Sequence, residues 1–223
     1  SWLSKLVPAG IPSAIVGYVD LTKEDAEAVL ERHLSFPKFR GVRQIIGMLE
    51  QRPDLSFTTE NLLRNSQWQE NFALLKKHRL SFDLQLYPEQ MTESADFLRG
   101  FPEVPVVIDH AGCPYDQSES GLQLWMNGLA SLAELPNLHI KLSGFGMYDK
   151  DWSSESTQLI FDTILENFSS NRIMWGSNFP VERLMNPYGF CVAQLLKWLA
   201  PLSEEEKNRV ASETAKNFYR IGE

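Results

Sequence analysis

The sequence Val106-Val107-Ile108-Asp109-His110-Ala111-Gly112-Cys113-Pro114 has the pattern of a buried strand followed by a tight turn. Consecutive β-branched residues without alternation are typical of a parallel strand that is covered on both faces. In a parallel α/β barrel the strand ends on this side point into the catalytic mouth, so an acid and an imidazole there are site candidates. A histidine bonded within the core is the alternative that this segment alone leaves open.

Strands and helices alternate on both sides of this segment. Apolar runs predict strands over residues 11–21, 41–46, 81–87, 106–108, 138–144 and 172–180. Apolar residues at helical spacing predict helices over residues 1–7, 22–30, 66–78, 88–99, 121–135, 156–168 and 203–219. This alternation indicates a parallel sheet. A doubly wound sheet and a barrel both remain open, since no glycine-rich nucleotide-binding fingerprint follows any strand.

The composition favours one globular domain that acts on a small molecule. A chain of 223 residues can bury one large core, and it contains no linker-like segment, so we expect a single domain over residues 1–223. The net charge of -8 argues against nucleic acid and anionic membranes as partners, because phosphate surfaces repel an acidic protein. A small-molecule substrate is therefore the expected partner.

The cysteines and the hydropathy indicate the cellular compartment. Cys113 and Cys191 are too few for a disulfide framework and lack the paired spacing of a zinc-thiolate site. No apolar run approaches the roughly 20 residues that span a bilayer. We therefore expect a soluble, cytoplasmic protein with reduced thiols.

Polar side chains on several predicted strands are expected to converge. Period-two alternation places Asp83, Gln85 and Tyr87 on one face of their strand, and Lys141 shares a face with Ser143. A lysine between apolar strand neighbours is rarely buried unless it is paired. We therefore favour an ion pair that lines a cavity for Lys141 over a surface position.

Other candidates have two interpretations each. Arg43 could clamp a substrate carboxylate through two hydrogen bonds or pair with Asp83. Tyr87 could offer its hydroxyl to the substrate or cap the core. Alternation along the strand places Asp109 opposite His110, which predicts a structural hydrogen-bond acceptor.

Five motifs occur in the order expected of the amidohydrolase 2 family, which this sequence resembles over nearly its whole length. They are Gly41-Val42-Arg43, Phe82-Asp83-Leu84, Val107 to Pro114, Lys141-Leu142-Ser143-Gly144 and Met174-Trp175-Gly176-Ser177-Asn178-Phe179-Pro180-Val181. The resemblance is strongest to the lactonase branch, which includes L-fuconolactonase, L-rhamnonolactonase and 2-pyrone-4,6-dicarboxylate lactonase. It implies a (β/α)8 TIM-like barrel and the hydrolysis of a sugar lactone or similar small ester by attack of water on the carbonyl.

Two departures from the family pattern shape the expected site. The family's first strand ends in His-x-His, which this sequence lacks, so we expect a barrel incomplete at the N-terminus with about six βα units. Asn178 stands where many members have an aspartate, and an amide cannot act as a general base at neutral pH. We predict His110 and Asn178 as catalytic residues. The predicted substrate-binding residues are Arg43, Gln85, Tyr87, Lys141 and Ser143.

The missing motif also bears on metal and on activity. A tight zinc site needs three protein ligands, so we predict no metal in this chain and a divalent ion such as zinc only in a longer form. The rival to a hydrolase is an inactive remnant that acts as a binding or regulatory protein. Two absent strands would leave open edges at residues 14–20 and 172–177, which predict a poorly cooperative melt, aggregation or pairing with another copy of the chain.

Overall fold

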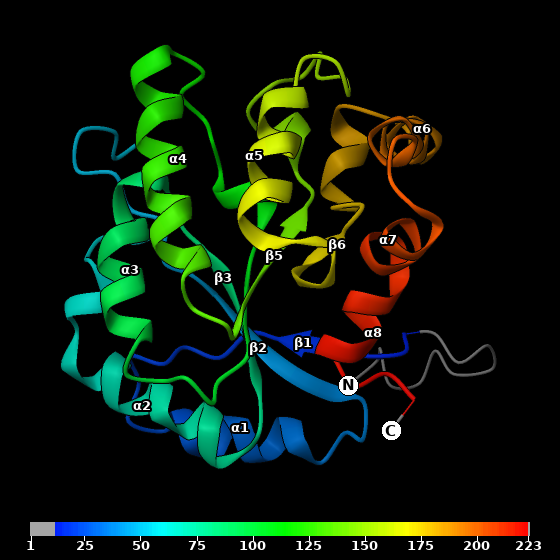
Figure 1. Ribbon diagram of the computed structural model, residues 1–223. Coiled ribbons are helices and arrows are strands. Elements are labelled where there is room, and N and C mark those ends of the chain that lie inside the picture. Colours follow the sequence, from blue (N-terminus) through cyan, green and yellow to red (C-terminus); the bar gives the residue numbers. More distant parts are fainter. Residues whose placement is uncertain (1–11, 223) are drawn as a thin grey trace.

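The computed structural model describes residues 12–222, which form a parallel sheet covered by helices (Figure 1). The six strands pair only with their neighbours in chain order, and every pairing is parallel. They are β1 (Ile15–Gly17), β2 (Phe39–Ile45), β3 (Ser81–Gln85), β4 (Val106–Ile108), β5 (Leu138–Leu142) and β6 (Ile173–Trp175). The predicted α/β class and the six predicted strands are confirmed, with shorter strands at both edges.

The helices follow the strands along the chain. They are α1 (Ala26–Leu34), α2 (Ser66–Lys77), α3 (Met91–Leu98), α4 (Glu119–Ala133), α5 (Gln158–Phe168), α6 (Tyr188–Leu199), α7 (Glu204–Asn208) and α8 (Thr214–Phe218). The helix predicted over residues 203–219 is present as α7 and α8, joined by a π-helical turn over Arg209–Glu213. Helix α6 was not predicted, and the helix predicted over residues 1–7 lies outside the described residues.

Local side-chain bonds explain where several helices begin. Asn65 accepts a hydrogen bond from the amide of Trp68 and starts α2, and the hydroxyl of Ser118 starts α4 in the same way. The helix predicted from residue 22 begins later, because Thr22 takes part in a turn. Its hydroxyl donates to the carboxylate of Asp20 at 2.7 Å, so the chain turns there and α1 begins only at Ala26.

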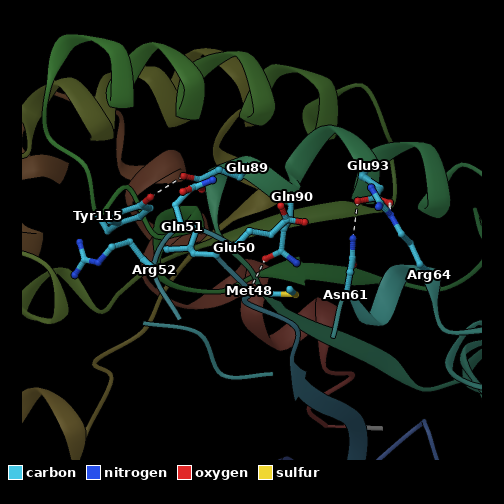
Figure 2. A pocket seen from close by; sticks show the side chains of 11 residues that line it. Met48, Glu50, Gln51, Arg52, Asn61, Arg64, Glu89, Gln90, Glu93 and Tyr115 are labelled. Carbon is cyan, nitrogen blue, oxygen red and sulfur yellow. Dashed lines mark hydrogen bonds and ion pairs between the residues drawn. The ribbon is translucent and has the colours of Figure 1, made fainter. Parts of the chain in front are cut away.

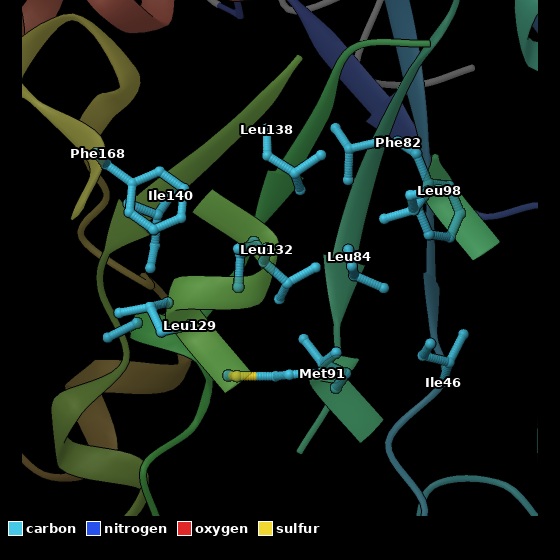
Figure 3. Close-up of a cluster of buried hydrophobic side chains, with 14 of the residues drawn as sticks. Ile46, Phe82, Leu84, Met91, Leu98, Leu129, Leu132, Leu138, Ile140 and Phe168 are labelled. Atoms are coloured by element: carbon cyan, nitrogen blue, oxygen red, sulfur yellow. The ribbon is translucent and has the colours of Figure 1, made fainter. Parts of the chain in front are cut away.

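The main core lies between the outer face of the sheet and the helices. Alternate residues of the strands, such as Phe82 and Leu84 on β3, contribute to it from the sheet. Figure 3 shows these side chains meeting Met91, Leu98 and Leu132 from the helices. Because the intervening strand residues point the other way, the inner face of the sheet is free to carry a different chemistry.

The inner face is covered near its base by the C-terminal helix. Val107 and Met174 pack against Phe218 of α8, and the Phe218 ring lies 4.8 Å from that of His139. Just after α8, Nη2 of Arg220 donates to the carbonyl of Arg40 on β2 at 3.3 Å, although these segments are far apart in sequence. Within residues 12–222, none of the helices has the length and apolar character that crossing a membrane requires.

Candidate active site

A cavity of about 320 Å³ opens on the inner face of the sheet, and all six strands or the turns after them contribute to it. Helix α8 and the residue after it close one side. The polar residues that line the cavity are Arg43, Asp83, Asp109, His110, Lys141, Ser143, Asn178 and Tyr219. Five of the predicted site residues, Arg43, His110, Lys141, Ser143 and Asn178, are thus brought together.

An ionic network forms the floor of the cavity. Nζ of Lys141 lies 2.8 Å from Oδ1 of Asp109 and is also bonded to Asp83. The other oxygen of Asp109 lies 3.1 Å from Nε of Arg43. Arg43 therefore pairs with Asp109 and not with Asp83, the alternative considered from the sequence. The expectation that Lys141 forms an ion pair lining a cavity is met.

The network fixes the charges of its members. Burial disfavours the ammonium form of Lys141, but the carboxylates of Asp109 and Asp83 outweigh this and hold the pKa of Lys141 well above its usual value. Burial would also raise the pKa of Asp109, yet Lys141 and Arg43 keep it below the usual value. For Asp83, burial dominates and raises the pKa. Two cations and two carboxyl groups thus nearly neutralise one another.

Tyr219 belongs to this network although nothing in the sequence pointed to it. Its hydroxyl donates to the Asp83 carboxylate, with distances of 3.0 and 2.9 Å to the two oxygens. Its ring lies beneath the ammonium of Lys141, 5.6 Å from centroid to Nζ. The contact spans 136 residues of sequence, and the helical pattern of residues 203–219 gave no signal for it.

Left-handed backbone places His110 in the cavity. His110, Ala111, Gly112 and Cys113 all have φ between 51° and 72°, a conformation that is uncommon for residues with a side chain. The strand alternation therefore stops after Ile108. Asp109 and His110 line the same cavity, which corrects the expectation that they lie on opposite sides. The ion pairs of Asp109 with Lys141 and Arg43 agree with its predicted role as an acceptor.

Neighbouring residues hold this turn in place. Nε1 of Trp125 donates to the carbonyl of Ala111 at 2.8 Å. Gly144 approaches the imidazole so closely that a Cβ there would lie 2.5 Å from Nδ1 of His110. Gly144 also has a φ of 72°, so a side chain at this position would be unfavourable both in conformation and in contact.

The hydrogen bonds of His110 assign its tautomer. Burial lowers the pKa of His110 to about 4, so the ring is neutral at pH 7. Nη2 of Arg43 lies 2.8 Å from Nε2, and a guanidinium can only donate, so Nε2 is the acceptor. Nδ1 therefore carries the hydrogen and donates to Oγ of Ser143 at 3.0 Å. The hydroxyl hydrogen of Ser143 is left available to a ligand.

Asn178 contributes a second available donor. It lines the same cavity, has a φ of 55°, and follows β6 in the turn that contains Pro180. Its Nδ2 is buried and, among the residues that the structure describes, has no hydrogen-bond partner. A buried unpaired donor is costly, so Nδ2 is a candidate donor to an oxygen atom of a ligand.

The remaining predicted residues lie at or beyond the edge of this cavity. The side chain of Gln85 accepts a hydrogen bond from Nη2 of Arg43, so it orients the guanidinium. Tyr87 lies elsewhere, in a small cluster with Leu49 and Cys113, and its hydroxyl donates to the carbonyl of Leu55 at 2.7 Å. Direct contact of Tyr87 with substrate stays a prediction.

The donor set does not suit a zinc ion. Zinc sites use three or four nitrogen, sulfur or carboxylate ligands. In the cavity the two carboxylates already bind Lys141 and Arg43, and Nε2 of His110 faces the guanidinium. Across residues 12–222, no group of three histidine, cysteine or acidic side chains could hold a metal ion. The described residues therefore do not form a zinc site by themselves, and a divalent metal in a longer form stays a prediction.

Comparisons with known proteins agree with the resemblance seen in the sequence. An uncharacterized protein (y4mH) of Sinorhizobium fredii is 32% identical over 212 residues, which cover 95% of this chain and 71% of that protein. An L-fucono-1,5-lactonase of Burkholderia ambifaria is 29% identical over 223 residues, which cover 94% of this chain and 71% of that enzyme.

A solved structure shares the fold. The crystal structure of an amidohydrolase from Burkholderia multivorans with bound zinc superimposes with a TM-score of 0.80 at 24% identity, covering 94% of this chain and 74% of that one. The family model described as Amidohydrolase matches residues 8–221. The chain is therefore a member of this amidohydrolase family, and we conclude that it is a hydrolase.

Proposed function

We propose that the protein hydrolyses a lactone of a sugar acid, or a related small carboxylic ester, by attack of water on the carbonyl carbon. The observation that carries this proposal is the chain of contacts from Arg43 through His110 to Ser143. In the same cavity, Nδ2 of Asn178 has no hydrogen-bond partner among the described residues. This arrangement combines a neutral nitrogen base, Nε2 of His110, with hydrogen-bond donors on Ser143 and Asn178 that could bind a carbonyl oxygen. The similarity to L-fucono-1,5-lactonases supports the lactone as substrate.

Substrate binding would free the base. In the structure Nε2 of His110 accepts from Arg43, whose side chain is 37% exposed and can reach the open part of the cavity. A bound substrate offers the guanidinium oxygen acceptors as an alternative to Nε2 of His110, because Arg43 has several donors and each can bond to an oxygen. Movement of Arg43 onto the substrate would leave Nε2 without its donor and ready to accept a proton.

The bond changes then balance without a co-reactant. Nε2 takes a proton from water, the water oxygen bonds to the carbonyl carbon, and the carbonyl electron pair moves onto its oxygen. Ser143 and Nδ2 of Asn178 donate to this oxyanion. When the carbonyl re-forms, the bond to the ester oxygen breaks and that oxygen takes the proton from His110. The product of a lactone is the open-chain hydroxy acid.

The test is hydrolysis of a panel of five- and six-membered aldonolactones, followed by proton release. We expect His110→Ala to lower turnover by about 10²-fold or more, because general bases typically contribute this much. Ser143→Ala should reduce kcat by about tenfold or more with a smaller effect on KM, since its hydroxyl acts mainly on the oxyanion. A matched control is Glu70→Ala, an exposed position on α2.

These measurements distinguish a hydrolase from an inactive remnant that only binds a ligand. Turnover that is unchanged in His110→Ala would place the chemistry elsewhere. If no lactone or ester is hydrolysed above the rate of that variant, while a lactone analogue still protects the protein against unfolding, the chain is a binding protein that retains the framework of a hydrolase.

We also infer that the six strands are consecutive strands of a (β/α)8-type barrel and that residues 1–223 form one domain. The strictly sequential parallel order and the likeness to the amidohydrolase structure support this. Amide hydrogen exchange can test it. The outer edges of β1 and β6 should exchange fast in the isolated chain, whereas closure of the sheet by pairing of β1 with β6 would protect them.

A further inference from the structure

A second cavity of about 300 Å³ lies at the same end of the sheet, beyond the ends of β2, β3 and β4 (Figure 2). We refer to the inner-face cavity that contains His110 as the catalytic cavity. Among the described residues, none lines both cavities. We call the second cavity the outer cavity. Its volume is at the lower end of the range for ligand sites, which suits a molecule of the size of one sugar ring.

Two opposite walls of the outer cavity are held by pairs of polar side chains. On one wall the hydroxyl of Tyr115 donates to Glu89 at 2.6 Å. On the other, Glu93 accepts from Arg64 at 2.7 Å and from Asn61 at 2.8 Å. Figure 2 shows these two groups on either side of the residues between them. The walls are therefore fixed by their own hydrogen bonds before any ligand arrives.

The floor is fixed as well. Oε1 of the buried Gln90 accepts from the amide of Met48 at 2.9 Å, and its Nε2 donates to the carbonyl of Ile46 at 2.9 Å. These bonds tie the start of the loop after β2 to the turn after β3. Leu49, which is almost fully buried, gives the floor an apolar part. The cavity is thus built on rigid elements, which reduces the cost of ordering on binding.

The loop above the floor carries exposed polar groups that are available to a ligand. Glu50 and Gln51 line the outer cavity and are exposed, and within residues 12–222 neither side chain has a hydrogen-bonded partner. Arg52 binds Asp54 at 2.8 Å and keeps further donors. The opening is therefore lined by an acceptor, an amide and a donor that are still able to bond to a ligand.

The charges of the lining select the class of ligand. An anion would face the carboxylates of Glu50, Glu89 and Glu93, and the two arginines that could attract it are already paired. A metal ion would have to displace Arg64 or Tyr115 from their acids. Hydroxyl groups fit best, because each can donate to a carboxylate and accept from an amide or guanidinium at the same time.

We propose that the outer cavity binds an uncharged monosaccharide, with hydroxyls that bridge Glu50 and Gln51 on the loop to the Glu89 and Tyr115 wall, and with its apolar side over Leu49. This site is separate from the catalytic cavity. The proposal does not depend on which ester the protein hydrolyses.

The experiment is a titration of the full chain with methyl glycosides of glucose, galactose and mannose, followed by ligand-observed saturation-transfer NMR. Methyl glycosides contain no ester, so catalysis cannot consume them. We expect saturable one-to-one binding of at least one of them with a Kd on the order of 1 mM. Glucuronate, the anionic counterpart of the glucoside, should bind more weakly.

Variants locate the binding. The double variant Glu50→Ala/Gln51→Ala should weaken binding about tenfold or more, the loss expected for two hydrogen bonds. Tyr115→Phe keeps the ring and should weaken it about threefold. Both Glu70→Ala, on an exposed part of α2, and Ser143→Ala, in the catalytic cavity, should leave the affinity unchanged. Glu50 and Gln51 are exposed, so the melting temperature of the double variant should match that of the parent.

Three results would overturn the proposal. They are the absence of saturable binding for all three glycosides, tighter binding of glucuronate, and binding that Ser143→Ala removes but Glu50→Ala/Gln51→Ala does not. Each can be read whether or not the protein proves to be a lactonase, because none of these measurements involves hydrolysis.

Discussion

On β3, Phe82 and Leu84 face the helices, whereas Asp83 between them faces the catalytic cavity. The outer face is apolar: the ring of Phe72, for instance, lies between 5.0 and 5.2 Å from the rings of Trp68, Phe82, Phe97 and Phe101. The inner face instead carries a few buried charges that stabilise one another as ion pairs. Contacts on the outer face are numerous and individually weak, while loss of one inner charge leaves others buried and unpaired.

Lys141→Met should have the largest effect, because it removes the cation that two buried carboxyl groups share. We expect the free energy of unfolding to fall by about 3–5 kcal/mol and the hydrolytic activity to be lost. Chemical denaturation and the lactone assay would measure the two losses. In a Lys141→Met/Asp83→Asn variant part of the stability should return. If the single variant is as stable as the parent, the inner face does not depend on its charges.

Phe72→Ala tests the outer face. Removing a fully buried phenylalanine should also cost about 3–5 kcal/mol, because the site cannot collapse fully around the space that is left. In contrast to Lys141→Met, the folded protein should keep its kcat, since Phe72 does not line the catalytic cavity. A large drop in kcat at a temperature where the variant is fully folded would show that the two faces are coupled.

The inner face should also make stability depend on pH. Burial lowers the pKa of His110 to about 4, below the ordinary 6.5, so the unfolded chain takes up this proton first as the pH falls. The neutral His110 ring therefore contributes to the free energy of unfolding fully above pH 6.5. This contribution is lost between pH 6.5 and about 4, and its upper limit is about 3 kcal/mol. Denaturation curves at pH 7, 6 and 5 should show this slope, and His110→Gln should reduce it. Part of the slope should remain, because burial also lowers the pKa of His139 to about 4. An equal slope in both proteins would contradict the buried neutral ring.

Tyr219→Phe should give the smallest effect, because Lys141 remains bound to Asp83 when the hydroxyl is removed. A hydrogen bond to a charged group contributes about 1.5–3 kcal/mol, so we expect a loss of stability of about 2 kcal/mol. The ring contacts with Phe218 are kept in this variant. A loss as large as that of Lys141→Met would mean that Tyr219, and not the lysine, holds Asp83 in place.

The sequence predicted the elements of the outer face well, because strands and helices leave periodic apolar patterns. Helix α6 was nevertheless missed, although its buried residues Cys191, Gln194, Leu195 and Trp198 have helical spacing. The signal was present and lay just after Pro187, where a helix can begin.

The inner face was harder to predict. Convergence of Lys141, Ser143 and His110 followed from strand alternation, but the side on which Asp109 lies did not, because left-handed backbone begins at His110 without a glycine to mark it. The bond from Tyr219 to Asp83 joins residues that no local pattern relates. Contacts of this kind depend on tertiary packing, which a single sequence does not encode in any periodic form.

The same bond sets the order in which the site can be assembled during synthesis. Asp83 leaves the ribosome 136 residues before Tyr219, an interval of roughly 7–27 s at about 5–20 residues per second. During that time the Asp83 carboxylate lacks the phenol and, at first, Lys141 as well. A nascent chain can therefore form its outer aromatic layer early, but the ionic floor of the inner-face cavity is complete only after Tyr219 has been synthesised.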